Sequence, residues 1–71
     1  MGDTSAGRFN LTAAESAVLV HLVDGRTPAD IAQLQDVSLA TVRTHIARLH
    51  EKFGVTRTLD VVRLALASGP L

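Results

Sequence analysis

The sequence predicts an all-α fold, a compact four-helix domain that contains a helix-turn-helix unit. Apolar residues recur at steps of three and four, and no segment shows the period-two alternation of a strand. Residues that typically cap helix amino termini precede the apolar segments, and glycine follows the first, third and last of them. From these signals we expect helices over about 12–24, 28–35, 39–53 and 57–67.

Length and composition fit one small domain. The chain has 71 residues, and we expect a flexible lead-in over 1–10 and the helix-turn-helix domain over 11–68. It has no cysteine, which excludes disulfides and thiolate metal sites. No apolar run approaches the roughly 20 residues needed to span a bilayer. We therefore expect no membrane contact and a cytoplasmic location.

Charge is distributed unevenly along the chain. Seven basic and seven acidic residues give a formal net charge of zero. Residues 1–37 hold two arginines and five acids, whereas 38–71 hold five basic residues and two acids. The second half is therefore positive, and it contains the helix with the clearest pattern.

The helix expected over 39–53 has a well-defined start, stop and inward face. Ser38 stands at the N-cap position, and Gly54 follows where a left-handed residue commonly ends a helix. The inward stripe consists of Val42, Ile46, Leu49 and Phe53.

The opposite side of this helix has a centre of mostly small side chains between basic ones. The central residues are Ala40, Thr44, Ala47 and Glu51. The flanking residues are Arg43 on one side and Thr41, Arg48 and Lys52 on the other, and His45 lies nearer the edge of the core. Such a surface suits a negatively charged object that is approached closely, such as the DNA major groove, although an ordinary exposed helix face is the alternative.

The first two expected helices carry capping signals. Thr12 and Glu15 have the spacing of a capping box, and Gly25 stands at the C′ position. Thr27 precedes Pro28, which is favourable at the first helical position. In the second helix we expect an inward set of Ile31, Ala32 and Leu34.

The first helix is apolar on nearly every side. Its expected core face is Leu11, Val18, Leu19 and Leu22. Further apolar residues lie around it, namely Ala17, Val20 and Val23, and this pattern predicts burial between other helices. His21 is interpreted as a packing or surface-edge residue because no partner converges on it.

The last expected helix has more apolar side chains than a domain of this size can bury. Either Thr56 or Thr58 could cap it. The surplus predicts self-association, and we expect the interface to include Val61, Leu64, Ala65 and Ala67.

Several motifs together resemble the C-terminal DNA-binding domain of LuxR/FixJ-type bacterial transcription regulators. They are LTAAESAVL, Gly25, PADIA and VSLATVRTHIARLHEKFGV, which cover Leu11 to about Ala65. The resemblance implies a sequence-specific regulator of four helices, with the third helix in the major groove of double-stranded DNA and a homodimer through the last helix. The site residues then expected are base-facing Arg43, Thr44, Ala47 and Arg48, and backbone-facing Ser38, Thr41, His45 and Lys52.

The sequence departs from this family pattern at a few positions. Ala14 replaces the usual arginine, Asp30 replaces glutamate, Asp36 stands where glycine is common in the turn, and Thr58 replaces arginine. Two other functions stay open: a sigma-factor-like promoter-recognition domain, and a protein-interaction module on the same fold that no longer binds DNA.

The residue pattern gives no support for catalysis. It contains no nucleophile–base pair, carboxylate pair or glycine-rich phosphate loop. His45 and His50 are five residues apart, whereas two zinc ligands on one helix face are usually four apart. We therefore expect no enzyme activity, metal, cofactor or small-molecule ligand in this domain.

Overall fold

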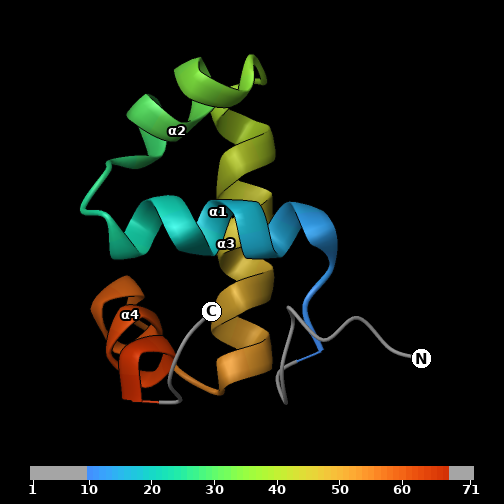
Figure 1. The fold of residues 1–71 in the computed structure, drawn as a ribbon. Helices are drawn as coiled ribbons and strands as arrows, with labels where there is room; N and C mark the ends of the chain where they lie inside the picture. Colours follow the sequence, from blue (N-terminus) through green and yellow to red (C-terminus); the bar gives the residue numbers. More distant parts are fainter. Residues whose placement is uncertain (1–9, 68–71) are drawn as a thin grey trace.

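The computed structural model describes residues 10–67. These residues form four helices: α1 (Ala13–Val23), α2 (Pro28–Gln35), α3 (Leu39–Phe53) and α4 (Thr58–Ala67) (Figure 1). The all-α fold is therefore confirmed, with bounds that differ from the expected ones by one residue at both ends of α1 and at the start of α4. Nearly all of the expected lead-in lies outside the described residues.

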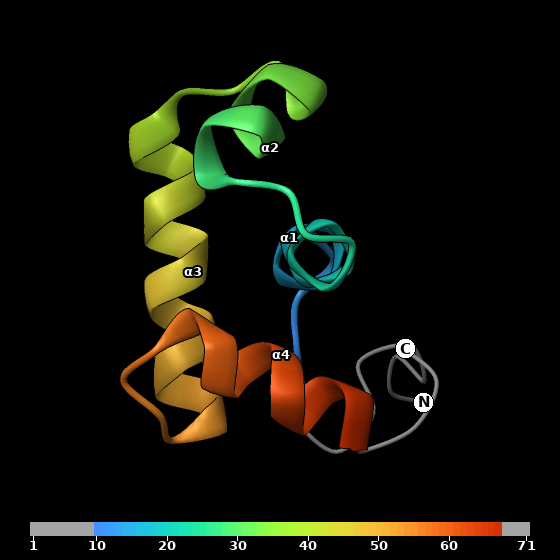
Figure 2. The same cartoon turned by 90° about the vertical axis from the view of Figure 1, so that its left-hand side faces the viewer.

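The helix α3 is the long element on which the others pack. In Figure 1, α1 crosses the middle of α3, α2 lies near its amino-terminal end and α4 near its carboxyl-terminal end. Figure 2 shows α1, α2 and most of α4 on one side of α3. Within the described part of the chain, the opposite side of α3 is left without a helical neighbour.

Both α1 and α2 begin with a complete capping box. Thr12 Oγ1 accepts a hydrogen bond from the Glu15 N–H at 3.1 Å, and Glu15 Oε1 accepts one from the Thr12 N–H at 3.0 Å. Thr27 and Asp30 repeat the arrangement at 3.1 and 3.2 Å. Four amide groups at helix starts are satisfied in this way, which fixes where the two helices begin.

The turn between α2 and α3 consists of three residues centred on a left-handed backbone. Asp36 has φ 55° and ψ 48°. Its N–H donates to the Gln33 carbonyl at 3.3 Å, and the Val37 N–H donates to the Ala32 carbonyl at 3.0 Å. This pair of bonds is a Schellman motif, so Asp36 takes the conformation that glycine adopts most easily. The helix-turn-helix unit is therefore confirmed.

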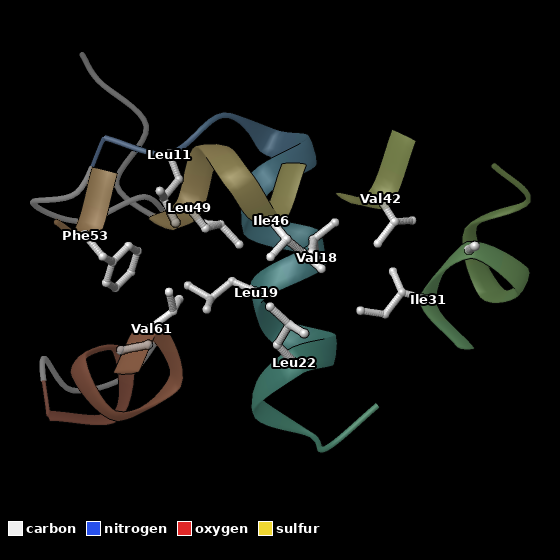
Figure 3. Packing of buried hydrophobic residues seen from close by; sticks show 12 residues of the cluster. Leu11, Val18, Leu19, Leu22, Ile31, Val42, Ile46, Leu49, Phe53 and Val61 are labelled. Atoms are coloured by element: carbon white, nitrogen blue, oxygen red, sulfur yellow. The ribbon is translucent and has the colours of Figure 1, made fainter. Parts of the chain in front are cut away.

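Side chains from all four helices meet in one core (Figure 3). The buried apolar residues are Leu11, Val18, Leu19, Leu22, Ile31, Ala32, Val42, Ile46, Leu49, Phe53, Val61 and Ala65. The inward stripe expected for α3 and the core face expected for α1 are therefore confirmed in full.

Two expectations about packing were wrong. Leu34 was expected to face inward but is 57% exposed, since the short helix α2 buries only the side that carries Ile31 and Ala32. Val20 and Ala17 are also exposed, because they lie on the side of α1 that α2, α3 and α4 leave open. The apolar residues on that side of α1 are therefore not buried.

The start of α4 is capped by neither threonine. The Val61 N–H donates to the Arg57 carbonyl at 3.3 Å, which puts Arg57 in the N-cap position. Thr58 lies in the first turn, and its Oγ1 is 3.1 Å from His50 Nε2. This hydrogen bond joins the end of α3 to the start of α4.

Candidate nucleic-acid interface

The side of α3 that no other helix covers carries the side chains that the sequence placed there. We define the outer face of α3 as Ala40, Arg43, Thr44, Ala47, Arg48 and Glu51, all of which are exposed. In Figure 2 this side of α3 is the left-hand edge of the molecule. A partner can therefore approach the helix backbone along the small residues without displacing another element.

Three of the six lysine and arginine side chains in residues 10–67 already have a carboxylate partner. Arg26 pairs with Asp24 at 3.1 Å and Arg57 pairs with Asp60 at 3.2 Å. Lys52 pairs with a carboxylate at 2.6 Å. These cations are less available to an external anion.

The remaining cations of residues 10–67 are Arg43, Arg48 and Arg63, none of which makes an ion pair there. Arg43 and Arg48 both lie on the outer face of α3. Five residues of helix separate them by about 7.5 Å along the axis and about 140° around it. They therefore stand on the two sides of the small central residues.

Thr44, at the centre of the outer face, makes a hydrogen bond within its own helix. Its Oγ1 donates to the Ala40 carbonyl at 3.0 Å. This bond selects one of the two χ1 rotamers open to a helical threonine. The side chain is exposed, so its methyl group and the remaining lone pairs of Oγ1 are accessible from outside.

The amino-terminal end of α3 holds Ser38 and Thr41. Ser38 Oγ accepts a hydrogen bond from the Thr41 N–H at 3.1 Å, and the two hydroxyl oxygens lie 2.9 Å apart. Both residues are exposed. The cap organises this helix end, where the macrodipole favours negative charge.

Lys52 connects α3 to the beginning of α1. Its Nζ donates to Glu15 Oε1 at 2.6 Å and to the Asn10 carbonyl at 3.1 Å. The Glu15 side chain is only 2% exposed, whereas that of Lys52 is 32% exposed. The ammonium group that the sequence assigned to a DNA phosphate therefore already serves a buried carboxylate.

The environment of Glu15 contains opposing influences on its acidity. Burial raises the pKa of Glu15, but the hydrogen bonds from Lys52 and from the Thr12 N–H, together with the positive charge of Lys52, outweigh burial. The net result is a pKa of Glu15 below its ordinary value, so the ionised carboxylate is the favoured form in the folded domain.

The two histidines of α3, His45 and His50, are both half-buried. His45 is half-buried, and its Nδ1 is buried without a hydrogen-bond partner in the described residues. The Nδ1 atom of His45 is therefore not available to an external phosphate. His50 is held by Thr58, as described above.

The residues expected at a dimer interface do not share one surface. Val61 is 0% exposed and Ala65 is 1% exposed, so both belong to the core of this chain. Leu64 is 38% exposed, and Ala67 is also exposed. Leu59 and Leu66 are more exposed, at 62% and 60%. They are seven residues apart and therefore lie on one side of α4. This spacing in the sequence could have indicated a shared exposed apolar surface.

Within residues 10–67, no cluster of three or more histidine or acidic side chains could hold a metal ion. No helix in this range is long and apolar enough to cross a membrane.

Comparison with known proteins identifies relatives for most of the chain. The family profile described as "Bacterial regulatory proteins, luxR family" matches residues 9–65. The transcriptional regulatory protein MctR of Rhizobium johnstonii is 37% identical over 63 residues, which are 89% of this chain and 29% of MctR. The uncharacterized response regulatory protein YgeK of Escherichia coli K12 is 34% identical over 59 residues, which are 83% of this chain and 40% of YgeK.

A solved structure shows the same fold. The crystal structure of the phage VqmA-DPO complex superposes with a TM-score of 0.84 and 34% sequence identity, covering 90% of this chain and 29% of that one. The chain thus spans well under half the length of each of these relatives. The family profile covers most of the chain, including the helix-turn-helix unit and the outer face of α3. The chain therefore belongs to the luxR family of bacterial regulatory proteins, as a helix-turn-helix DNA-binding domain and not as an enzyme.

Proposed function

We propose that this domain binds double-stranded DNA sequence-specifically, with α3 in the major groove, and that it does so as a homodimer. The observation that carries the proposal is the outer face of α3. Two of the three cations that lack an ion pair within residues 10–67, Arg43 and Arg48, lie on this face, on the side of α3 that no other described helix covers.

The shape of this face supports entry into the major groove. The groove of B-DNA admits one α-helix, provided that its side chains do not hold it away from the base edges. Ala40, Thr44 and Ala47 are small and exposed, so the helix backbone can come close to the bases. The arginines on either side can then reach guanine or the phosphates of the two strands.

Individual roles follow from position and access. We assign base contacts to Arg43, Thr44, Ala47 and Arg48, and we assign Arg48 to a neighbouring phosphate as well. Ser38 and Thr41 are assigned to the DNA backbone at the amino-terminal end of α3, and His45 is also assigned to the backbone. Lys52 is omitted from this set because its ammonium group binds the buried Glu15 carboxylate.

The proposed dimer uses the exposed apolar side of α4. Leu59 and Leu66 form its centre, because they are the most exposed large apolar residues of that helix. Leu64 and Ala67 lie on another side of α4 and provide the alternative interface. An isologous contact of either kind would present two copies of α3 to a palindromic site.

The experiment is a selection from random DNA duplexes, followed by binding measurements on the selected and scrambled sequences at several salt concentrations. We expect a defined consensus and a log–log salt slope of about −1 to −2 per domain, since each phosphate that an arginine neutralises contributes about −0.9. A protein-interaction module would select no sequence and would not bind at low salt.

A matched pair of variants tests the site itself. The double variant Arg43→Ala/Arg48→Ala should lose binding to the selected duplex. Arg26→Ala removes a positive charge from the connection between α1 and α2, where the arginine pairs with Asp24, and should bind almost as the parent does. If both variants lose the same DNA affinity for each positive charge removed, the DNA is attracted by overall charge. That result would contradict the assignment of the DNA-binding site to α3.

A further inference from the structure

Resting on the proposed function, we infer that Thr44 makes the centre of the outer face read the thymine methyl group of a T·A base pair and disfavour guanine there. The inference starts from one contact. Thr44 Oγ1 donates its only proton to the Ala40 carbonyl at 3.0 Å, while the side chain stays exposed. The hydroxyl group therefore has no proton left for a base.

What the centre of the outer face offers to DNA is consequently restricted. Thr44 presents a methyl group and an oxygen that can only accept a hydrogen bond. Ala40 and Ala47 present methyl groups on either side of it. Hydrogen-bond donors on this face come from the flanking Arg43 and Arg48.

The base edges of the major groove differ in how well they match this centre. Guanine presents two acceptors, N7 and O6, and so requires a donor. Thymine presents a methyl group that can pack against the methyl groups of the protein. Its paired adenine presents an N6 amino group, which can donate a hydrogen bond to the threonine oxygen. Cytosine offers a comparable N4 donor but lacks the methyl group. Thymine with its paired adenine is therefore the best match.

Reading guanine through Thr44 would require its hydroxyl to rotate away from the Ala40 carbonyl. That carbonyl would lose a hydrogen bond, and the threonine would lose the rotamer that this bond selects. Guanine recognition is accordingly left to the arginines on the flanks, and the centre of the half-site is specified by a methyl group.

Methyl deletion in the DNA tests this inference directly. After the consensus has been selected, each thymine is replaced in turn by deoxyuridine, which lacks only the C5 methyl group. We expect one central position per half-site at which affinity falls about fourfold, the value of one buried methyl group. Replacing that thymine by 5-methylcytosine, opposite guanine, should retain more affinity than replacing it by cytosine.

Two variants assign the effect to Thr44. Thr44→Ser keeps the hydroxyl and deletes the methyl group, so it should bind the thymine and deoxyuridine duplexes almost equally. Thr44→Val keeps the methyl group and deletes the hydroxyl, so it should retain the deoxyuridine effect. Thermal melting of both variants is the control for folding.

The outcomes separate this inference from the proposed function. Sequence-specific binding without any deoxyuridine effect, or an effect that persists in Thr44→Ser, overturns the role of Thr44 and leaves the DNA-binding function standing. A selected consensus with guanine at the base pair where Thr44 substitutions change affinity also overturns the role of Thr44 and leaves the DNA-binding function standing. Absence of sequence-specific binding overturns both.

Discussion

Lys52 Nζ lies 2.6 Å from Glu15 Oε1, and this ion pair joins the last turn of α3 to the first turn of α1. The same carboxylate completes the capping box with Thr12, and the same ammonium group reaches the Asn10 carbonyl. The Glu15 carboxylate therefore caps the start of α1 and also holds α3 against α1. The orientation of the outer face of α3 depends on residues that do not lie on that face.

Lys52→Met should lower the free energy of unfolding by about 2 kcal/mol, because it leaves the nearly buried Glu15 carboxylate without its charged partner. Methionine keeps most of the apolar stem, so the effect isolates the ammonium group. Urea denaturation provides the measurement. Arg48→Met is the control on the same helix, since Arg48 is exposed and has no ion pair in the described residues; its effect should stay within about 0.5 kcal/mol. Equal stability of the two variants would show that the ion pair contributes nothing measurable.

The lowered pKa of Glu15 predicts that part of the stability depends on pH. In the unfolded chain the pKa of Glu15 has its ordinary value, and in the folded domain it lies below that value. The unfolded chain therefore takes up the proton first. The stabilisation is fully present above the unfolded pKa and is lost as pH falls through the folded pKa.

Glu15→Gln provides the comparison, because glutamine can keep the capping box while removing the charge. We expect the variant to be less stable than the parent at neutral pH, with the difference narrowing below about pH 4.3. Urea titrations across this range measure the difference at each pH. A difference that is constant with pH would mean that the charge of Glu15 is not what stabilises the fold.

The packing of α3 could be predicted from sequence because its pattern admits one solution. Val42, Ile46, Leu49 and Phe53 form a narrow stripe, and the residues opposite are small or charged. Such a helix can bury only one side. The same reasoning does not work for α1, where Val20 and Ala17 are as apolar as residues that are buried.

Contacts between helices could not be predicted in the same way. Lys52 and Glu15 are 37 positions apart, and their pairing follows from how α1 crosses α3. In α4, valine and leucine occupy most of the circumference, so periodicity does not reveal which side docks. The hydrogen bond between His50 and Thr58 at 3.1 Å joins α3 to the start of α4, and Val61 faces the core. The sequence alone does not predict the hydrogen bond between His50 and Thr58.

Arg43 and Arg48 should differ in what their loss does to DNA binding. Arg43→Ala should cost about 1–3 kcal/mol on the selected site and relax the preference at one or two base pairs. Arg48→Ala should weaken binding to the scrambled duplex as well as to the selected one, and should reduce the salt slope by about one, because Arg48 is assigned to a phosphate in addition to a base. Binding series on both duplexes at several salt concentrations distinguish the two effects.

Lys52→Met serves as the comparison in those series. Because its ammonium group is bound to Glu15, the variant should leave the salt slope unchanged even where the domain is less stable. A slope reduced by one in Lys52→Met would instead restore Lys52 as a phosphate contact. If Arg43→Ala weakens both duplexes equally, Arg43 holds the DNA backbone and does not read a base.

The proposed dimer can be tested by comparing two leucines of α4. Leu66→Glu puts a charge on the side shared with Leu59 and should abolish the dimer on palindromic DNA, with little loss of stability because Leu66 is 60% exposed. Leu64→Glu should have a smaller effect on the dimer. Analytical ultracentrifugation on a palindromic duplex measures both. The opposite ranking would place the interface on the Leu64 side, and two unaffected dimers would exclude α4.

The turn between α2 and α3 contains a non-glycine residue with a left-handed backbone conformation. Asp36 has φ 55°, a conformation that costs an ordinary side chain roughly 1 kcal/mol and glycine very little. Asp36→Gly should therefore raise the free energy of unfolding by up to about 0.5 kcal/mol, since the added flexibility of the unfolded chain offsets part of the strain that is relieved.

Two further variants separate backbone strain from charge. Asp36→Asn removes the negative charge at the carboxyl end of α2 but keeps a residue that tolerates this conformation, whereas Asp36→Ala removes the charge and does not tolerate it. Denaturant titrations should give glycine as the most stable of the three, asparagine next and alanine last. Equal stability of the alanine and glycine variants would mean that the turn does not require a left-handed residue. Because the turn sets how α2 meets α3, the alanine variant should also show the weakest binding to the selected duplex.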